Sequence, residues 1–224
     1  MSAVRFTDVL RGKAATTWRR ELEHPFVRGL ASGALPIERF RFYLRQDYLF
    51  LIEYCRVFAL AAAKARDLEH IRIFASLLHE TLHTEMELHR DYCARLGIAA
   101  HQLERSEPAP VTHAYTRHLL NVAYGGALPE ILAAVLPCQL GYAEIGAGLA
   151  REPNWQASAY AEWIRAYSSP EFVASAERLR AMLDELTAGW PPAALEPLEG
   201  HFLMSTRYEY LFWEMSWNES QWPL

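Results

Sequence analysis

Apolar side chains recur every three to four residues along most of the chain, which is the spacing of α-helices with one buried face. Prolines and glycines interrupt this period at intervals, and no segment shows sustained alternation of β-branched residues. The pattern therefore predicts an all-α bundle of about seven to eight helices. We expect these helices over residues 3–23, 37–65, 68–96, 112–124, 128–150, 154–168, 171–189 and 194–218.

The predicted loops are short, and the chain has neither an internal repeat nor a linker long enough to separate two domains. With 224 residues, of which 51% are hydrophobic, the chain can bury one substantial core. We therefore expect a single helical domain over residues 1–224. No stretch approaches 18 consecutive apolar residues, so we expect no helix that spans a membrane.

The formal net charge is −5, and Lys and Arg are scattered without a run, which disfavours nucleic acid and anionic membranes as partners. The three cysteines show no CxxC spacing. The N-terminal sequence lacks the apolar stretch and cleavage site of a signal peptide. We expect a cytoplasmic protein with reduced thiols.

Asp47 lies within the apolar stripe of the second predicted helix, together with Tyr43 and Phe50. A buried, unpaired carboxylate costs roughly several kcal/mol, so its position needs a reason. One reason is a structural ion pair with an arginine such as Arg45 or Arg56. Because these arginines project from other angles of the helix, the pattern favours a carboxylate that accepts an N–H group of a ligand.

Glu209 occupies the equivalent position in the last predicted helix, one turn before Phe212 and Trp213 and one turn after Ser205. Burial among such residues raises the pKa of a carboxyl group, which suits a residue that donates and recovers a proton near neutral pH. Glu209 is therefore our candidate general acid/base. The alternative is a glutamate that only hydrogen-bonds to a neighbouring helix.

Cys138 directly follows Pro137 inside a third apolar helix. A proline in a helix interior costs about 3 kcal/mol, and the resulting kink can expose the next side chain to a cavity. Tyr142 lies one turn further along the same face. A single cysteine on an apolar face is more often inert packing, which is our interpretation of Cys55 and Cys93. An activating base for Cys138 would have to come from another helix.

The string HETLH, formed by residues 79–83, matches the zinc-protease pattern, and Glu80 with His83 matches an element of di-iron proteins. A metal site needs more ligands than this string supplies. The pattern places the nearby candidates Glu85, Glu87 and His89 on an exposed face. We therefore expect no metal and interpret the segment as a mostly exposed helix.

Three motifs occur in a characteristic order and spacing: QDYLFL at 46–51, LPCQLGYAEIG at 136–146 and YEYLFWEMSW at 208–217. Together they resemble the TenA family, also called thiaminase II or aminopyrimidine aminohydrolase. The segment HPFVRGLASGAL and Tyr115 in PVTHAYTRHLL are similar too, so the resemblance covers nearly the whole chain. Cys138 places the chain in the branch that has a cysteine nucleophile.

The resemblance implies a heme-oxygenase-like helical fold, usually a homotetramer, that works without a cofactor. It implies hydrolysis of a C–N bond of a small pyrimidine, 4-amino-5-aminomethyl-2-methylpyrimidine. The products would be the 5-hydroxymethyl compound, which is salvaged for thiamin, and ammonia. Many members of the family also cleave thiamin itself, slowly.

The resemblance also implies a role for each matched residue. Cys138 would add to the pyrimidine ring as the nucleophile, while Glu209 would protonate and deprotonate a ring nitrogen. Asp47 would hold the exocyclic amine and the ring. The remaining aromatic residues would line the pocket: Phe50, Tyr115, Tyr142 and Tyr167.

The chain departs from the family pattern in two places. Phe50 stands where some members have a tyrosine, which keeps a stacking face but loses a hydroxyl group. Leu140 and Gly141 stand where bulkier groups can occur, which would enlarge the pocket and admit a different pyrimidine.

Two other functions compete with the hydrolase. A metal- or haem-dependent oxygenase on the same fold would need an early helical histidine, whereas His24 stands just before Pro25. A non-catalytic pyrimidine-binding or regulatory protein is the other, because some family members are named transcriptional activators. The chain has no evident helix-turn-helix with a basic recognition helix, so we expect the hydrolase.

Overall fold

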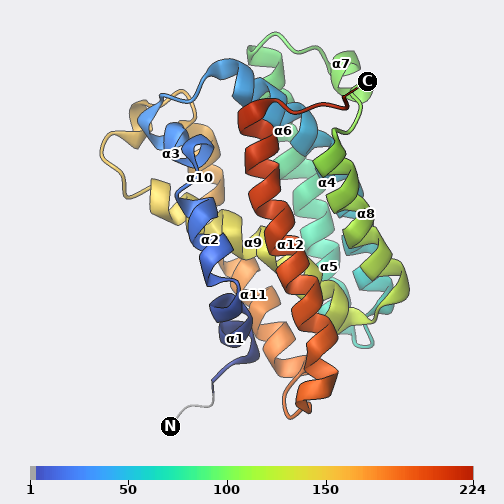
Figure 1. Ribbon diagram of the computed structural model, residues 1–224. Helices are drawn as coiled ribbons and strands as arrows, with labels where there is room; N and C mark the ends of the chain where they lie inside the picture. Colours follow the sequence, from blue (N-terminus) through green and yellow to red (C-terminus); the bar gives the residue numbers. More distant parts are fainter. Residues whose placement is uncertain (1–3, 224) are drawn as a thin grey trace. The chain divides into compact units, whose positions relative to one another are not determined.

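The protein is described by a computed structural model that covers residues 4–223, with only the backbone described for Ala100 and Glu104 (Figure 1). Every regular element in this range is helical, which confirms the predicted all-α class. The α-helices are α1 (Phe6–Lys13), α2 (Ala15–Leu22), α3 (Pro25–Ser32), α4 (Ile37–Lys64), α5 (Leu68–Glu80), α6 (Met86–Arg95), α7 (Ala100–Glu104), α8 (Pro110–Gly125), α9 (Leu128–Leu149), α10 (Ala161–Tyr167), α11 (Pro170–Leu186) and α12 (Pro192–Asn218). A π-helical turn, η1 (Thr81–Glu85), joins α5 to α6, and a 3₁₀ turn, η2 (Trp155–Ala157), precedes α10.

The structure divides the chain into more helices than the seven to eight expected. The predicted helix 3–23 is two helices that meet at Ala14, and its expected start at residue 3 lies outside the described residues. The π-helical turn divides the predicted helix 68–96. The short helices α3 and α7, of 8 and 5 residues, were not predicted, because so few turns show too little of the helical period.

The described chain forms two compact units, each made of segments far apart in the sequence. Unit 1 comprises the chain up to Pro36 and Leu132–Glu214, and unit 2 comprises Ile37–Ile131 and the chain from Met215 onward. Unit 1 thus contains α1 to α3, α10, α11 and most of α9 and α12. The expectation of a single domain over residues 1–224 stays a prediction.

Unit 2 is built around α4, the longest helix of the described chain. Figure 1 shows α5 and α8 lying along α4, and both helices contact it over several turns. The buried face of α4 carries a row of aromatic rings, in which Phe50, Tyr54 and Phe58 follow one another with ring centroids 5.2 Å and 4.5 Å apart. Because these rings recur every three to four residues along the buried face, the apolar stripe of α4 could be predicted from the sequence.

In unit 1 the side chains from α9 are mostly buried. By length and composition this helix could cross a membrane, but 78% of its apolar 18-residue stretch is buried inside the protein. Such burial is typical of the core helix of a globular protein. Gly146 of α9 lets the chain at Tyr167 pass very close: a Cβ atom at residue 146 would lie 2.5 Å from the Tyr167 carbonyl group.

Candidate functional site

Cys138 lies in the middle of α9, which continues through Pro137 without a break. Because proline has no N–H group, the turn before Cys138 lacks one helical hydrogen bond. Cys138 is half-buried, whereas Cys55 and Cys93 of unit 2 are buried. Burial raises the pKa of the Cys55 and Cys93 thiols to about 11, so these two cysteines are unreactive near neutral pH.

A cluster of aromatic rings in unit 1 joins the helix of Cys138 to the helix of Glu209. The Tyr142 ring, one turn beyond Cys138, lies 4.8 Å from the Tyr167 ring and 5.3 Å from the Trp213 ring. Trp213 in turn lies one turn beyond Glu209 on α12. The structure therefore brings together the turns that carry the four residues predicted for this part of the site, Cys138, Tyr142, Tyr167 and Glu209.

Glu209 is 3% exposed, which confirms that the sequence pattern places this carboxyl group in the interior. Its neighbours one turn away on α12 are the buried Ser205 and Trp213. Burial among such groups disfavours the charged form of a carboxyl group.

Glu21 of α2 is a second buried carboxyl group in unit 1 that the sequence analysis missed. It is 2% exposed, and its Oε1 atom has no hydrogen-bond partner within the described part of the chain. Burial and the nearby charge of Glu209 raise the pKa of Glu21 well above its usual range; the Arg11 charge opposes this shift. The sequence did contain a signal: Leu10, Ala14, Trp18 and Glu21 follow a spacing of three and four residues, and all four are buried.

Asp47 of unit 2 makes a buried hydrogen-bonded pair with a histidine from α6. The distance from Asp47 Oδ2 to His89 Nε2 is 2.5 Å, and the Tyr43 hydroxyl donates to the same oxygen over 3.1 Å. The other ring nitrogen of His89 lies 2.8 Å from the carbonyl oxygen of Glu85. Asp47 is therefore held by protein groups, and neither of the two arginines considered from the sequence is the partner in this pair.

The expectation that His89 lies on an exposed face is wrong, because its side chain is fully buried. Met86, His89 and Cys93 are all buried and recur at intervals of three and four residues. This helical spacing was the sequence signal that His89 lies on the buried face. Burial lowers the pKa of His89, but the charge and hydrogen bond of Asp47 outweigh burial, so its pKa is raised. The Asp47 carboxyl group thus favours the protonated form of the buried His89 ring.

Phe50 and Tyr115 also come together within unit 2, as α4 and α8 pack side by side. Their ring centroids are 5.1 Å apart, and both side chains are buried. Phe50 lies one turn beyond Asp47 on α4. Asp47, Phe50 and Tyr115, the three residues that the sequence analysis assigned to substrate binding in this unit, thus form one cluster.

The HETLH string ends α5 and enters the π-helical turn η1. The rings of His79 and His83 are 4.4 Å apart. Among residues 4–223 no group of three or more His, Cys, Asp or Glu side chains is arranged to hold a metal ion. The expectation of a metal-free protein stays a prediction.

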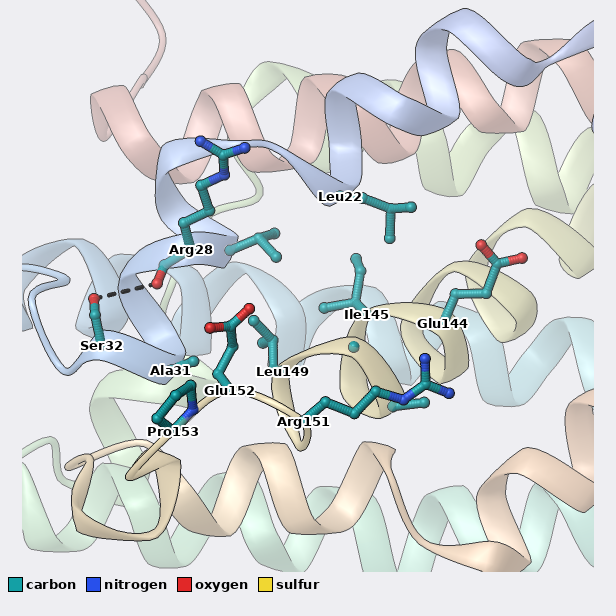
Figure 2. A pocket seen from close by; sticks show the side chains of 13 residues that line it. Leu22, Arg28, Ala31, Ser32, Glu144, Ile145, Leu149, Arg151, Glu152 and Pro153 are labelled. Carbon is teal, nitrogen blue, oxygen red and sulfur yellow. Dashed lines mark hydrogen bonds between the residues drawn. The ribbon is translucent and has the colours of Figure 1, made fainter.

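Unit 1 also contains a pocket of about 840 Å³ between α3 and the C-terminal half of α9. Figure 2 shows Arg28 of α3, Glu144 of α9, and Arg151 and Glu152 from the segment after α9 among the residues around it. Glu144 accepts hydrogen bonds from Arg11 and, over 2.8 Å, from the Trp18 ring N–H. None of the predicted site residues lines this pocket, so it is distinct from the cluster around Cys138 and Glu209.

Comparison with known proteins shows the family to which the chain belongs. The TENA/THI-4/PQQC family model matches residues 11–219. The chain is 45% identical over 218 residues to an aminopyrimidine aminohydrolase from Halalkalibacterium halodurans, covering 97% of each protein. It is 37% identical over 212 residues to an aminopyrimidine aminohydrolase from Helicobacter pylori, covering 94% of this chain and 98% of that protein.

Solved structures of similar fold support the same family. A TenA homologue protein from P. horikoshii OT3 matches with a TM-score of 0.87 and 31% identity, covering 96% of this chain and 99% of that chain. A domain of unknown function with a heme oxygenase-like fold, from Shewanella denitrificans OS217, matches with a TM-score of 0.76 and 17% identity, covering 97% of this chain and 94% of that chain. The second match concerns the fold alone, and it supports the expected heme-oxygenase-like fold. On the length and identity of these matches, the chain belongs to the TENA/THI-4/PQQC family, as the three motifs predicted.

Proposed function

We propose that this protein is an aminopyrimidine aminohydrolase that hydrolyses the C–N bond of 4-amino-5-aminomethyl-2-methylpyrimidine, with thiamin as a slower second substrate. The observation that carries the proposal is the cluster in unit 1, where a half-buried cysteine and a buried glutamate lie on helices joined by the Tyr142 and Trp213 rings. The names of the relatives that match over nearly their whole length support the same activity.

In this proposal Cys138 acts as the nucleophile. Its thiolate forms a C–S bond to a ring carbon, while Glu209 gives a proton to a ring nitrogen. The amine then leaves the methylene carbon as ammonia, and the hydroxyl group of water adds to that carbon. Breakage of the C–S bond restores the aromatic ring and the thiolate, and the ring proton returns to Glu209. The water supplies the proton that the amine takes with it, so the step balances.

The aromatic residues of unit 1 have a supporting role in this proposal. Tyr142 and Tyr167 meet edge to face beside the Cys138 turn, and such rings offer both a stacking surface and hydroxyl groups to a pyrimidine. The binding roles implied for Asp47, Phe50 and Tyr115 stay predictions. For Asp47 the pair with His89 adds a structural role to the one predicted.

The geometry of His24 gives no support to a haem-dependent function. His24 is buried at the start of α3, where its Nδ1 atom accepts a hydrogen bond from the Phe26 N–H over 3.2 Å. Its Nε2 atom lies 3.7 Å from a carboxylate oxygen of Glu214. His24 therefore acts as the N-cap of α3, a role that accounts for a histidine before a proline.

We further propose that the enzyme works in the cytoplasm as a homotetramer. The three cysteines are free thiols, which suits a reducing compartment. The tetramer is proposed from the family resemblance. The absence of nucleic-acid and membrane partners remains an expectation from the charge distribution.

The test is ammonia release from the purified, metal-free protein supplied with 4-amino-5-aminomethyl-2-methylpyrimidine. We expect release by the wild type, no turnover by Cys138→Ala, and a strong loss of rate at neutral pH for Glu209→Gln. Cys55→Ala, which removes a buried thiol of unit 2, is the matched control and should keep its activity. No release by a folded wild type would refute the substrate, and turnover by Cys138→Ala would refute the nucleophile.

A further inference from the structure

The protein holds the Asp47 carboxylate of α4 by one of its two oxygens. Oδ2 accepts a hydrogen bond from the Tyr43 hydroxyl over 3.1 Å and lies 2.5 Å from His89 Nε2. No group among the described residues hydrogen-bonds to the other oxygen, Oδ1. The carboxylate therefore has one oxygen fixed by the protein and a second oxygen that can accept a hydrogen bond from a ligand.

His89 lies on the enclosed side of this pair. Its side chain is 1% exposed, whereas that of Asp47 is 5% exposed, so the little surface that the pair keeps belongs mainly to the carboxylate. The Tyr43 ring, one turn before Asp47 on α4, lies against the His89 ring with centroids 6.4 Å apart. A ligand of Asp47 need not touch His89, so an effect of His89 on binding passes through the carboxylate.

The second ring nitrogen of His89 fixes the orientation of the imidazole. Nδ1 lies 2.8 Å from the Glu85 carbonyl oxygen, which can only accept a hydrogen bond, so Nδ1 carries a proton and donates it. Nε2 and Oδ2 then have one proton between them, whichever of the two atoms holds it. A flip of the ring would put carbon atoms in place of both nitrogens. The two hydrogen bonds therefore hold the ring in the orientation that supports Asp47.

The π-helical turn η1 keeps His89 on the buried face. Phe74, Leu77 and Thr81 are buried at intervals of three and four residues, but the next buried positions are Met86 and His89. The step of five from Thr81 to Met86 coincides with the wide turn, in which the Met86 N–H donates to the Thr81 carbonyl oxygen. In an uninterrupted α-helix His89 would point about 80° away from Thr81. The turn absorbs the extra residue, and such turns are frequent at functional sites.

We propose that His89 is a positioning residue of the ligand site at Asp47: it fixes the carboxylate through Oδ2 and leaves Oδ1 to accept an N–H group of the aminopyrimidine. The inference rests on the proposed function, because the ligand is the pyrimidine of that reaction. A carboxylate that is already fixed loses less conformational freedom when the ligand arrives, so binding is stronger. His89 acts only through Asp47.

The first test is the affinity for 4-amino-5-hydroxymethyl-2-methylpyrimidine, the proposed product, measured by titration calorimetry. Glutamine and methionine have similar length, but only glutamine has an N–H group to donate to Asp47. His89→Met should raise Kd about tenfold or more, and His89→Gln should recover most of this loss, because a hydrogen bond to a carboxylate is a strong one. His101→Gln, at an exposed histidine of the same unit, should leave Kd unchanged. An unchanged Kd in His89→Met would overturn the proposal, and so would equal losses in both variants, which would indicate packing alone.

The second test needs neither turnover nor a ligand. Proton NMR of the wild type should show a strongly deshielded imidazole N–H resonance from the 2.5 Å hydrogen bond between His89 and Asp47. This resonance should be missing from His89→Gln and present in His101→Gln. Its absence from the wild type would refute the fixed carboxylate, even if His89→Met does not fold. Its presence in a wild type that does not bind the pyrimidine would support the fixed carboxylate and refute only the pyrimidine as its ligand.

Discussion

Asp47 and His89 lie 42 positions apart in the sequence, and their carboxylate and imidazole groups meet at 2.5 Å in the interior of unit 2. The Asp47 side chain is thus part of the packing of α4 against α6 as well as a candidate ligand group. A carboxylate used only for a ligand would leave the free protein with an uncompensated buried charge, whereas this pair compensates it before any ligand arrives.

Asp47→Asn should destabilise the protein in the absence of substrate by about 3 kcal/mol, because it removes the main counter-charge of the buried His89 ring. The pKa of His89 is raised in the folded state, so its contribution to stability is fully present below the unfolded pKa and is lost as the pH rises through the folded pKa. The loss from Asp47→Asn should therefore be larger at pH 6 than at pH 9. Urea unfolding at both pH values measures it.

The control for this measurement is Asp91→Asn, an exposed aspartate on the same helix as His89, which should change the free energy of unfolding little at either pH. Equal stability of Asp47→Asn and the wild type would mean that the pair is energetically unimportant and that Asp47 serves only a ligand.

Iodoacetamide at pH 8 should alkylate Cys138 first among the three cysteines. Cys138 is half-buried, while the pKa of Cys55 and of Cys93 is about 11, so only about one in a thousand of their thiols is ionised at this pH. Intact mass should show one adduct per native chain and three after unfolding. Loss of ammonia release should follow the first adduct, and rapid labelling of native Cys138→Ala would contradict this order.

Glu21→Gln should change the pH dependence of stability in a defined direction. The pKa of Glu21 is raised in the folded state, so the folded protein binds more protons than the unfolded chain above pH 4.5, and stability falls as the pH rises through this window. Glutamine does not titrate. The melting temperature of Glu21→Gln relative to the wild type should therefore be higher at pH 8 than at pH 4.5, as calorimetry can show, with Glu23→Gln giving no such trend.

Gly146→Ala should destabilise the protein and disturb Tyr167. The added Cβ would lie 2.5 Å from the Tyr167 carbonyl carbon and oxygen, and a backbone cannot move aside as a flexible side chain can. We expect a cost of about 3 kcal/mol and a raised KM, since the Tyr167 ring contacts the Tyr142 ring beside Cys138.

Gly148→Ala is the matched control on the same helix. A Cβ there meets nothing within 4 Å, so the change should stabilise α9 by about 0.5–1 kcal/mol. A Gly146→Ala variant as stable as Gly148→Ala would show that α10 is not held closely against α9. Thermal unfolding of both variants provides the comparison.

The long helices could be predicted closely from the sequence. The expected segments 37–65, 128–150 and 194–218 correspond to α4, α9 and α12 within two residues at each end. An apolar repeat sustained over six or more turns, bounded by proline or glycine, is a strong local signal. The short helices α3 and α7 carry too few turns to show it.

The sequence by itself determined which residues are chemically out of place, because an acid or a cysteine within an apolar stripe is visible from local spacing. Cys138, Glu209 and Asp47 were found in this way. Only the tertiary structure decided which groups lie near these residues: His89 hydrogen-bonds to Asp47, and the charge of Glu209 acts on the buried Glu21. Such relationships depend on how helices far apart in the chain pack, so no periodicity along the chain encodes them.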